Sequence, residues 1–329
     1  MPLSRPASAA DIHYRVEPTD LHAHLFTVTL TVQRPTASQE LSLPVWIPGS
    51  YLVREFSKNL QALAARQGQR ALQTAQLDKH RWQVQCAEGK PLVLTYQVCA
   101  YDSSVRTAWL DASRGFFNGT SLCLRVHGQE TQPHTLELAR TAATATWAAA
   151  TGLRPLGADK QGFGLYAAAD YDELVDCPVE LGNFWVGRFK ACGIAHQFVV
   201  AGAAPSFDGK RLLADTQKIC ETAIRFWHRE GKAPFKSYVF MLNAVGDGYG
   251  GLEHRNSTAL ICGRRDLPRQ GEARASEGYT TLLGLISHEY FHTWNVKRLR
   301  PAEFARYDYA QENYTELLWF FEGFTSYYD

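Results

Sequence analysis

The residues with the clearest chemical potential are two histidines and a glutamate in a short segment, His288-Glu289-Tyr290-Phe291-His292. Side chains four positions apart lie on one face of an α-helix, so His288 and His292 can share a metal ion. Zinc in hydrolytic sites takes two histidines and one carboxylate and keeps a further position for water. The metal lowers the pKa of that water, and Glu289 can take its proton. The segment therefore predicts a helix that carries metal ligands and a general base.

An HExxH pattern also arises by chance, and two histidines on one helix face can be ordinary core or surface residues. The rest of the expected helix, from its N-terminal cap at Ser276 to Trp294, is strongly apolar. Histidine and glutamate side chains in such surroundings need compensating partners. The metal site is therefore the favoured interpretation, with a structural role as its alternative.

A third ligand has to come from a carboxylate, and four downstream glutamates are candidates. Glu322 belongs to an aromatic-rich helix, expected from about residue 313 to 329, that must pack in a core. A carboxylate buried among aromatic side chains is costly unless a cation compensates it. Glu312 and Glu316 lie nearer the first turn of that helix, where the helix dipole favours an acid without a metal. Glu303 is the fourth candidate, and we choose Glu322.

The elements that position these residues change character along the chain. Short alternating runs rich in β-branched residues, separated by turn residues, fill the first half and predict a sandwich-like sheet domain. Strand and helix patterns mix in the second half. We expect an α+β protein with an all-β domain at residues 1–180 and a mixed α/β domain at 181–329. The expected strands include 25–33, 41–47, 81–85, 91–98, a strand ending at 198–201, 238–245 and 257–262, and a further helix is expected at about 215–230.

Composition narrows the classes of function. The 329 residues include 34 Lys and Arg against 33 Asp and Glu, a formal charge of +1. This balance argues against nucleic acid or an anionic membrane as the main partner. No apolar run reaches the ~20 residues that span a bilayer. No secretory signal is recognised, and seven cysteines without a CxxC pair are typical of free thiols, so we expect a cytoplasmic protein.

Two motifs resemble a known family. The segments HEYFHTWNVKRLRP (288–301) and ELLWFFEGFTSYYD (316–329) are similar to those of the glycyl aminopeptidases, family sixty-one of the metallopeptidases. Four upstream segments support the resemblance, which extends over almost the whole chain. These segments are PVWIPGSYLVREFSKNL (44–60), FFNGTSLCL (116–124), DELVDCPVE (172–180) and GYGGLEHRNST (248–258).

The resemblance implies a thermolysin-like catalytic domain of the gluzincin clan behind an N-terminal β domain. It implies His288, His292 and Glu322 as ligands of one zinc ion per chain, and Glu289 as the general base. Family members usually continue with more helices and a PDZ domain. We therefore expect the chain to be truncated on the C-terminal side of its catalytic domain and to lack an oxyanion-stabilising residue.

A glycine-rich segment is the second functional element. Related aminopeptidases carry Gly-x-Met-Glu-Asn at a sheet edge beside the zinc, and the matching stretch here runs from Gly250 through Gly251 and Glu253 to His254. The resemblance implies that Glu253 binds the α-amine of the substrate while Gly250 and Gly251 let the substrate backbone approach. A plain hairpin loop with a solvated glutamate is the alternative, and His254 departs from the motif's Asn.

We therefore expect a zinc aminopeptidase acting on peptides, with a preference for small N-terminal residues, Gly or Ala, that the resemblance implies. A zinc endopeptidase with the same chemistry and an inactive, truncated peptide-binding remnant are the alternatives. Peptides are the expected partners, and the oligomeric state is left open. The basic run at Lys297, Arg298 and Arg300 could hold a substrate carboxylate, but a solvated helix end is the preferred interpretation.

Overall fold

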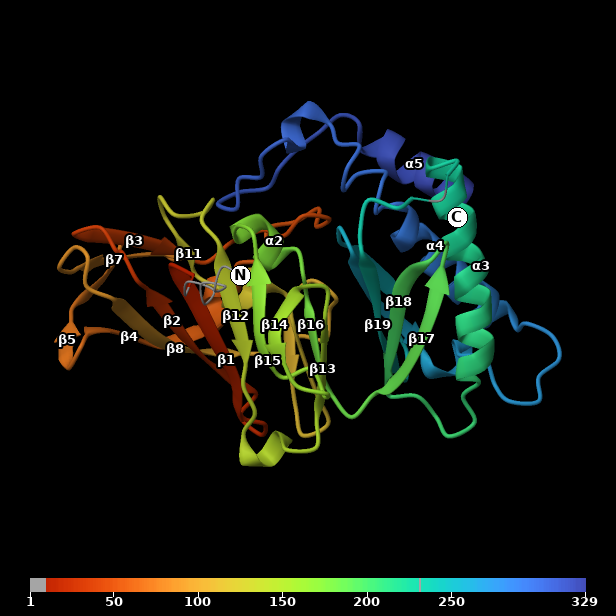
Figure 1. Ribbon diagram of the computed structural model, residues 1–329, viewed down its shortest axis with the longest axis horizontal. Helices are drawn as coiled ribbons and strands as arrows, with labels where there is room; N and C mark the ends of the chain where they lie inside the picture. Colours follow the sequence, from red (N-terminus) through yellow and green to blue (C-terminus); the bar gives the residue numbers. More distant parts are fainter. Residues whose placement is uncertain (1–9, 231) are drawn as a thin grey trace, which may run out of the picture.

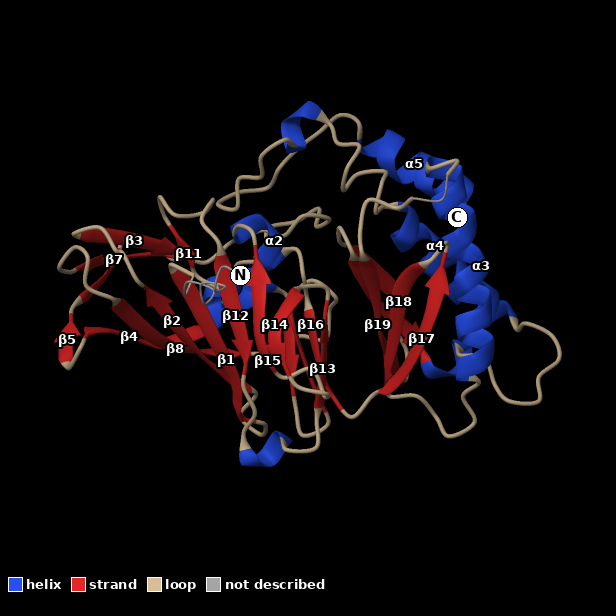
Figure 2. Ribbon diagram, in the orientation of Figure 1, coloured by secondary structure: helices blue, strands red, loops and turns tan. Residues whose placement is uncertain are grey.

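The architecture was obtained as a computed structural model that describes residues 10–230 and 232–329. A strand-rich half is followed by a half in which helices cover a sheet (Figures 1 and 2). This arrangement confirms the predicted α+β class. No helix in the described ranges has the length and apolar character needed to cross a membrane.

The largest sheet of the described residues has eight strands, and its centre shows why the alternating runs fold this way. Along β2 every second side chain, from Phe26 to Val32, is buried, and the threonines between them face outward. β1 alternates in the same way and pairs with β2 antiparallel and with β12 parallel. In sheet order the strands are β14 (Arg154–Ala158), β15 (Gly164–Ala168), β12 (His134–Leu138), β1 (Ile12–Asp20), β2 (Leu25–Val32), β8 (Leu92–Cys99), β4 (Leu60–Gln67) and β5 (Arg70–Leu72).

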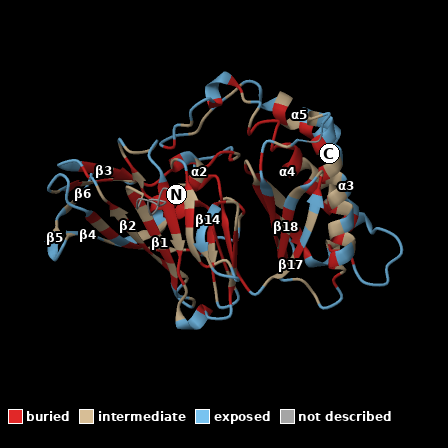
Figure 3. Cartoon of the chain, viewed as in Figure 1, coloured by how far each residue is buried: buried red, intermediate tan, exposed pale blue. Residues whose placement is uncertain are grey.

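Two four-stranded sheets complete the strand-rich half within the described ranges, and one hydrophobic core joins all three sheets (Figure 3). β16 contains the boundary proposed between residues 180 and 181. The first of the two sheets has the order β13 (Ala148–Thr151), β16 (Val179–Gly182), β10 (Arg114–Phe117), β9 (Ala108–Leu110), and the second has the order β11 (Arg125–Val126), β3 (Ser38–Ser42), β7 (Arg81–Gln85), β6 (Thr74–Gln76).

The strand predicted at 41–47 is wrong over most of its length. β3 ends at Ser42, and the next five residues run as buried irregular chain. Pro44 has no N–H to donate to a sheet ladder. Instead, the N–H of Val45 donates to the carbonyl of Tyr309, 2.8 Å away in the second half of the chain.

The second half is built on a mixed five-stranded sheet, counted over the described residues. β18, β19 and β21 run parallel, and β20 is an antiparallel edge strand beside β21. Helices α3 and α4 share a hydrophobic core with this sheet. The strand order is β17 (Trp185–Ala191), β18 (Ile194–Ala201), β19 (Ser237–Val245), β21 (Ser257–Gly263), β20 (Gly250–Glu253).

The helix predicted from residue 215 begins earlier. Asp208 is its N-cap, since its side chain accepts a hydrogen bond from the N–H of Arg211. Asp215 lies within the helix and accepts a hydrogen bond from the hydroxyl of Tyr279 on α4. The α-helices are α1 (Gly119–Leu122), α2 (Tyr171–Val175), α3 (Gly209–Trp227), α4 (Glu277–Phe291) and α5 (Leu318–Tyr328), and the 3₁₀ turns are η1 (Phe56–Asn59), η2 (Ala142–Thr144), η3 (Arg264–Asp266) and η4 (Ala302–Phe304).

Candidate metal centre

Helix α4 carries the two histidines and is firmly anchored. Ser276 caps it by accepting from the N–H of Tyr279, as predicted. The helix ends at Phe291 and not at Trp294, so His292 is its C-cap, although its N–H still donates to the carbonyl of His288 at 3.1 Å. The two imidazoles therefore keep their one-turn spacing.

A buried hydrogen bond fixes the opposite side of α4. The Nδ1 atom of His196 on β18 lies 2.9 Å from the carbonyl of Ile194, and its Nε2 lies 2.9 Å from the hydroxyl of Tyr290. Because the carbonyl can only accept, Nδ1 carries the proton and Nε2 accepts from Tyr290. This contact ties the helix to the centre of the sheet.

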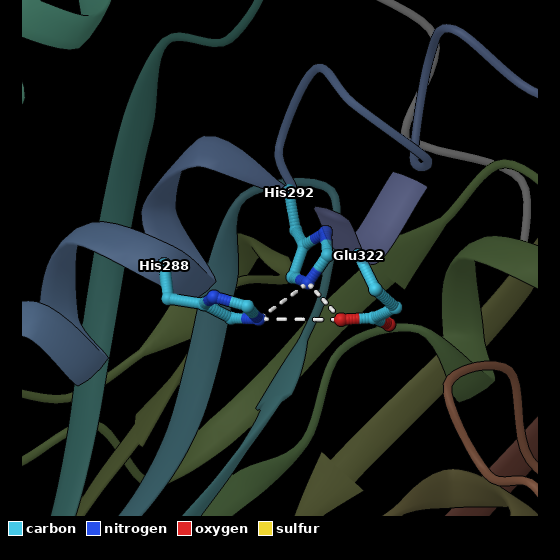
Figure 4. A group of neighbouring side chains, drawn as sticks. All are labelled: His288, His292 and Glu322. Atoms are coloured by element: carbon cyan, nitrogen blue, oxygen red, sulfur yellow. Dashed lines mark hydrogen bonds and ion pairs between the residues drawn. The ribbon is translucent and has the colours of Figure 1, made fainter. Parts of the chain in front are cut away.

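Three potential ligand atoms converge at the end of α4 (Figure 4). The Nε2 atoms of His288 and His292 are 3.0 Å apart. The Oε2 atom of Glu322 on α5 lies 3.4 Å from Nε2 of His288 and 3.6 Å from Nε2 of His292. The structure thus brings together the two histidines and the glutamate that the sequence singled out.

The Nδ1 atoms of both imidazoles, on the side away from the cluster, have hydrogen-bond partners. Nδ1 of His288 lies 2.9 Å from Oδ2 of Asp329, and Nδ1 of His292 lies 2.9 Å from the carbonyl of Asn295. Both partners accept hydrogen bonds, so in neutral rings both Nδ1 atoms donate and both Nε2 lone pairs face each other. Such a cluster needs a proton or a cation between its atoms. Two imidazole nitrogens and one carboxylate oxygen, held from behind by such acceptors, fit a zinc ion.

Charges within the cluster shift its titration. Burial disfavours charge on His292, but its interaction with Glu322 and the negative charges of Glu253 and Glu289 together outweigh this and raise the pKa of His292 to about 9. Burial also opposes ionisation of Glu322, yet hydrogen bonds from His288 and His292 hold its pKa well below the usual range. The side chains thus favour positive charge at the histidines and negative charge at Glu322.

Helix α5 is less buried than expected. Phe321 and Thr325 pack inward, but Trp319 is 68% exposed and Tyr327 is 78% exposed. The expectation that this aromatic helix packs in a core therefore holds for one face only, since most of its other aromatic side chains are exposed. Glu322 is half-buried and faces the site, where the hydroxyl of Tyr51 donates to its Oε1 at 2.8 Å.

Glu289 lies buried beside the cluster. It is 5% exposed, and its Oε2 has no hydrogen-bond partner among the described residues. Burial raises its pKa to about 7, against the attraction of His292. A Cβ on Gly251 would lie 2.1 Å from its Oε1. The glycine at 251 therefore makes room for Glu289, a reason that the motif alone does not reveal.

Glu253 lies on the sheet edge of the same site, at the end of β20. Its side chain is almost buried and makes no hydrogen bond or ion pair with a described residue. The loop of Gly49, from the strand-rich half, passes directly over it, because a Cβ there would lie 2.7 Å from Oε2 of Glu253. A Cβ on Gly250 would meet open space. The carboxylate is thus held close to the metal cluster without a hydrogen bond or ion pair to a described residue.

These groups surround one cavity of about 320 Å³. Both halves of the chain line it. The lining residues are Gly49, Tyr51, Arg106, Tyr249, Gly250, Gly251, Glu253, Leu285, His288, Glu289, His292, Glu322, Ser326 and Asp329.

Comparison with known families agrees with this geometry. The family model of the Peptidase M61 N-terminal domain matches residues 13–183, and the model of M61 glycyl aminopeptidase matches residues 281–329. The chain belongs to the M61 peptidase family. No curated protein matches it.

Several solved protein structures resemble the structure of this M61 chain. An aminopeptidase N family protein from Idiomarina loihiensis is 46% identical, with a TM-score of 0.93 over 96% of this chain and 53% of that one. The chain therefore spans about half the length of that protein. Two distant likenesses show the fold alone. They are Legionella pneumophila aminopeptidase A (11% identity, TM-score 0.54, 87% of this chain and 34% of that one) and an M1 zinc metallopeptidase from Deinococcus radiodurans (15%, 0.50, 88% and 65%).

The other glutamates considered as ligands of the M61 site lie elsewhere. Glu312 and Glu316 precede α5 and are not in its first turn, contrary to expectation. Oε1 of Glu312 accepts from the N–H of Val53 at 2.8 Å. Glu303 accepts from the hydroxyl of Thr315. None of the three lines the cavity.

The expectation of a solvated basic run after α4 is also wrong. Lys297 is buried, and its Nζ lies 2.8 Å from Oδ1 of Asp176, just after α2. Arg255 donates from Nε to the other oxygen of Asp176 at 2.8 Å. Burial opposes ionisation of Asp176, but Lys297 and its neighbours hold its pKa well below the usual range. This cluster joins the two halves of the chain next to the site.

Sequence reasoning missed three groups of the site. Arg106 and Gly49 come from loops of the strand-rich half, and Tyr249 precedes the edge strand. A weak signal existed for Gly49, which lies in the upstream segment at 44–60 that resembles the family. Nothing in the local sequence marks Arg106.

Proposed function

We propose that the chain is a zinc-dependent aminopeptidase that releases the N-terminal residue of peptides. The observation that carries this proposal is the convergence, around one cavity, of the ligand set of His288, His292 and Glu322 with two further carboxylates, Glu289 and Glu253. Each carboxylate has a separate use in such a reaction.

Zinc, when bound, supplies a Lewis acid that polarises the scissile carbonyl and makes water more acidic. The two Nε2 atoms and Oε2 of Glu322 would hold it. Glu289 accepts a proton from the attacking water and gives it to the amine that leaves as the peptide bond breaks. Its pKa near neutrality and its lack of another partner suit both transfers. Asp329 and the carbonyl of Asn295 keep the imidazoles oriented.

Glu253 gives the proposal its exopeptidase character. A buried carboxylate without a hydrogen-bond partner is costly, and an ammonium group of the substrate would relieve that cost through charge-assisted hydrogen bonds. β20 is the last strand of its sheet among the described residues, so its free edge can pair with an extended peptide. A zinc endopeptidase would not require this carboxylate, so its position favours the aminopeptidase.

A preference for small N-terminal residues, Gly or Ala, is part of the proposal. Its support is the description of the matching family, glycyl aminopeptidase. Of the similar proteins, the Deinococcus enzyme is described with a bound Tyr-Ser-Ala substrate and the Legionella enzyme with aspartic acid. Peptides are accordingly the proposed partners of this chain.

Metal analysis combined with hydrolysis of Gly- and Ala-anilides tests the proposal. About one zinc per chain with turnover of free-amine substrates is the expected result. Zinc without any turnover supports an inactive peptide-binding remnant, and absence of zinc removes the ligand assignment. N-acetylated anilides distinguish the endopeptidase, because an aminopeptidase turns them over poorly. Glu253→Gln, which keeps shape but not charge, should reduce turnover of the free-amine substrates alone.

A further inference from the structure

One cationic side chain of the strand-rich half reaches the candidate site. Arg106, in the loop between β8 and β9, lines the cavity that holds Glu253 and Glu289. Its side chain is half-buried, and its Nη2 donates to the carbonyl of Gly251 at 3.4 Å. Among the described residues that line this cavity, it is the one lysine or arginine.

The guanidinium of Arg106 has hydrogen-bonding capacity to spare. It offers five N–H donors, of which the contact with Gly251 uses one. Within the described ranges it makes no ion pair, whereas Lys297 and Arg255 are both engaged by Asp176. In the part of the chain that the structure describes, the cavity therefore contains one guanidinium able to receive an anionic group, close to carboxylates with which it forms no ion pair.

The spacing of the charged groups defines the size of a matching ligand. Arg106 contacts the strand at Gly251, and Glu253 lies two residues further along β20, a separation of about 7 Å at the rise of a β-strand. Two residues of extended peptide span about the same length. A dipeptide laid along this edge can therefore place its ammonium group at Glu253 and its carboxylate near Arg106.

We propose that Arg106 binds the free C-terminal carboxylate of a dipeptide whose ammonium group is held by Glu253. The inference rests on the proposed aminopeptidase function and makes dipeptides with a free carboxylate the preferred class among its substrates. Guanidinium and carboxylate can pair through two parallel hydrogen bonds, so the contact selects position as well as charge. An amidated dipeptide leaves Arg106 without its anion and binds more weakly.

Equilibrium binding tests this without depending on turnover. The zinc-loaded Glu289→Gln chain, which retains a bound peptide, is titrated calorimetrically with Ala-Ala and with Ala-Ala amide. Ala-Ala should bind about 10- to 100-fold more tightly, the range for a hydrogen bond to a charged group. Adding Arg106→Gln should abolish most of this preference and leave the affinity for the amide unchanged. Arg106→Lys should keep part of this preference, because lysine retains the positive charge but lacks the planar guanidinium that pairs with a carboxylate through two hydrogen bonds.

Arg54→Gln in the same background is the matched control. Arg54 donates to the hydroxyl of Ser50 and does not line the cavity. Thermal melting verifies that each variant is folded. The proposal is overturned if Ala-Ala does not bind, if it binds no better than its amide, if Arg106→Gln weakens both ligands equally, or if Arg54→Gln has the same effect.

Ligands with an acetylated N-terminus distinguish a failure of the Arg106 contact from a failure of the proposed aminopeptidase function. N-acetyl-Ala-Ala should bind more weakly than Ala-Ala, because Glu253 loses its ammonium partner. Equal binding of the two contradicts the aminopeptidase assignment. If acetyl-Ala-Ala still binds better than its amide, the contact between Arg106 and the carboxylate stands.

Discussion

The two helices that supply the metal cluster are held in very different ways. α4 packs against the sheet beside α3, with Tyr290, Ile286 and Leu282 almost wholly buried. α5 buries Phe321 and Thr325 and leaves most of its other aromatic side chains exposed. Within the described residues, the site therefore joins a ligand pair fixed by the core to a third ligand on a helix that buries few of its side chains. Changes on α4 should alter chemistry and stability, and changes on α5 should act mainly through the metal.

The largest effect is expected from Glu289→Gln on α4. The amide keeps the shape of the buried side chain but cannot accept a proton, so hydrolysis should fall by about 10²–10⁴-fold. Zinc content should stay the same, because Glu289 is not placed as a ligand. Steady-state rates and metal analysis on the same sample provide the measurement. Loss of zinc equal to that in His288→Ala would show that Glu289 is a ligand instead.

On α5, Glu322→Ala should weaken zinc binding by more than about 100-fold, since even partners behind a ligand contribute 10- to 100-fold. The fold should persist, because Glu322 is half-buried and its partners among the described residues, Tyr51, His288 and His292, are polar groups of the site. Competition with a chelator measures the affinity. Glu312→Ala and Glu316→Ala are the matched controls, and stripping of the metal by either of them would refute the choice of third ligand.

The anchor of α4 should produce a dependence of stability on pH. Burial lowers the pKa of His196 from 6.5 to about 4, so the folded chain keeps this ring neutral. The stabilisation is fully present above pH 6.5 and is lost as the pH falls towards 4, because the unfolded chain takes up a proton first. The loss should reach up to about 3 kcal/mol at 1.36 kcal/mol per pKa unit.

His196→Phe isolates this contribution. The variant leaves the Tyr290 hydroxyl without its acceptor and should cost about 1–3 kcal/mol at pH 7. However, its free energy of unfolding in urea should fall less between pH 6.5 and 4 than that of the original chain. Parallel curves for the two proteins would show that His196 does not titrate in this range.

The contrast between the helices also explains what the sequence could predict. The strands at 81–85, 238–245 and 257–262 and the cap at Ser276 depend on neighbouring residues, and all appear in the structure. The predicted start of α3 at Asp215 was wrong, because Asp208 and Asp215 are equally good N-caps in the sequence. Packing against distant residues decides between them. The helix predicted from about residue 313 begins only at Leu318, and Asn295, in the segment after α4, donates to the carbonyl of Phe321 in its first turn.

At the site, local spacing was enough for His288, Glu289 and His292. It was not enough for groups that arrive from the other half of the chain. The hydroxyl of Tyr51 reaches Glu322 across 271 positions, and Arg106 reaches Gly251 across 145. From its local sequence Lys297 is predicted to be a solvated charge. Only the structure shows that Asp176, from the strand-rich half, pairs with it. Such pairs form when the two halves of the chain pack together, and a local sequence pattern cannot predict that packing.

The smallest effect concerns the attachment of α5. Nδ2 of Asn295 donates to the carbonyl of Phe321 at 3.1 Å and to the hydroxyl of Thr325 at 3.2 Å. Asn295→Ala removes both bonds but keeps the backbone carbonyl that orients His292, so about 1–2 kcal/mol is lost at α5 alone. Zinc affinity should therefore fall about 10-fold, by the relation of 1.4 kcal/mol per tenfold, while the melting temperature of the zinc-free chain changes little. Thr315→Ala, which removes an exposed hydrogen bond just before α5, should change neither quantity. If Asn295→Ala lowers the melting temperature and leaves zinc affinity intact, α5 is held by the core as firmly as α4, and the contrast between the two helices fails.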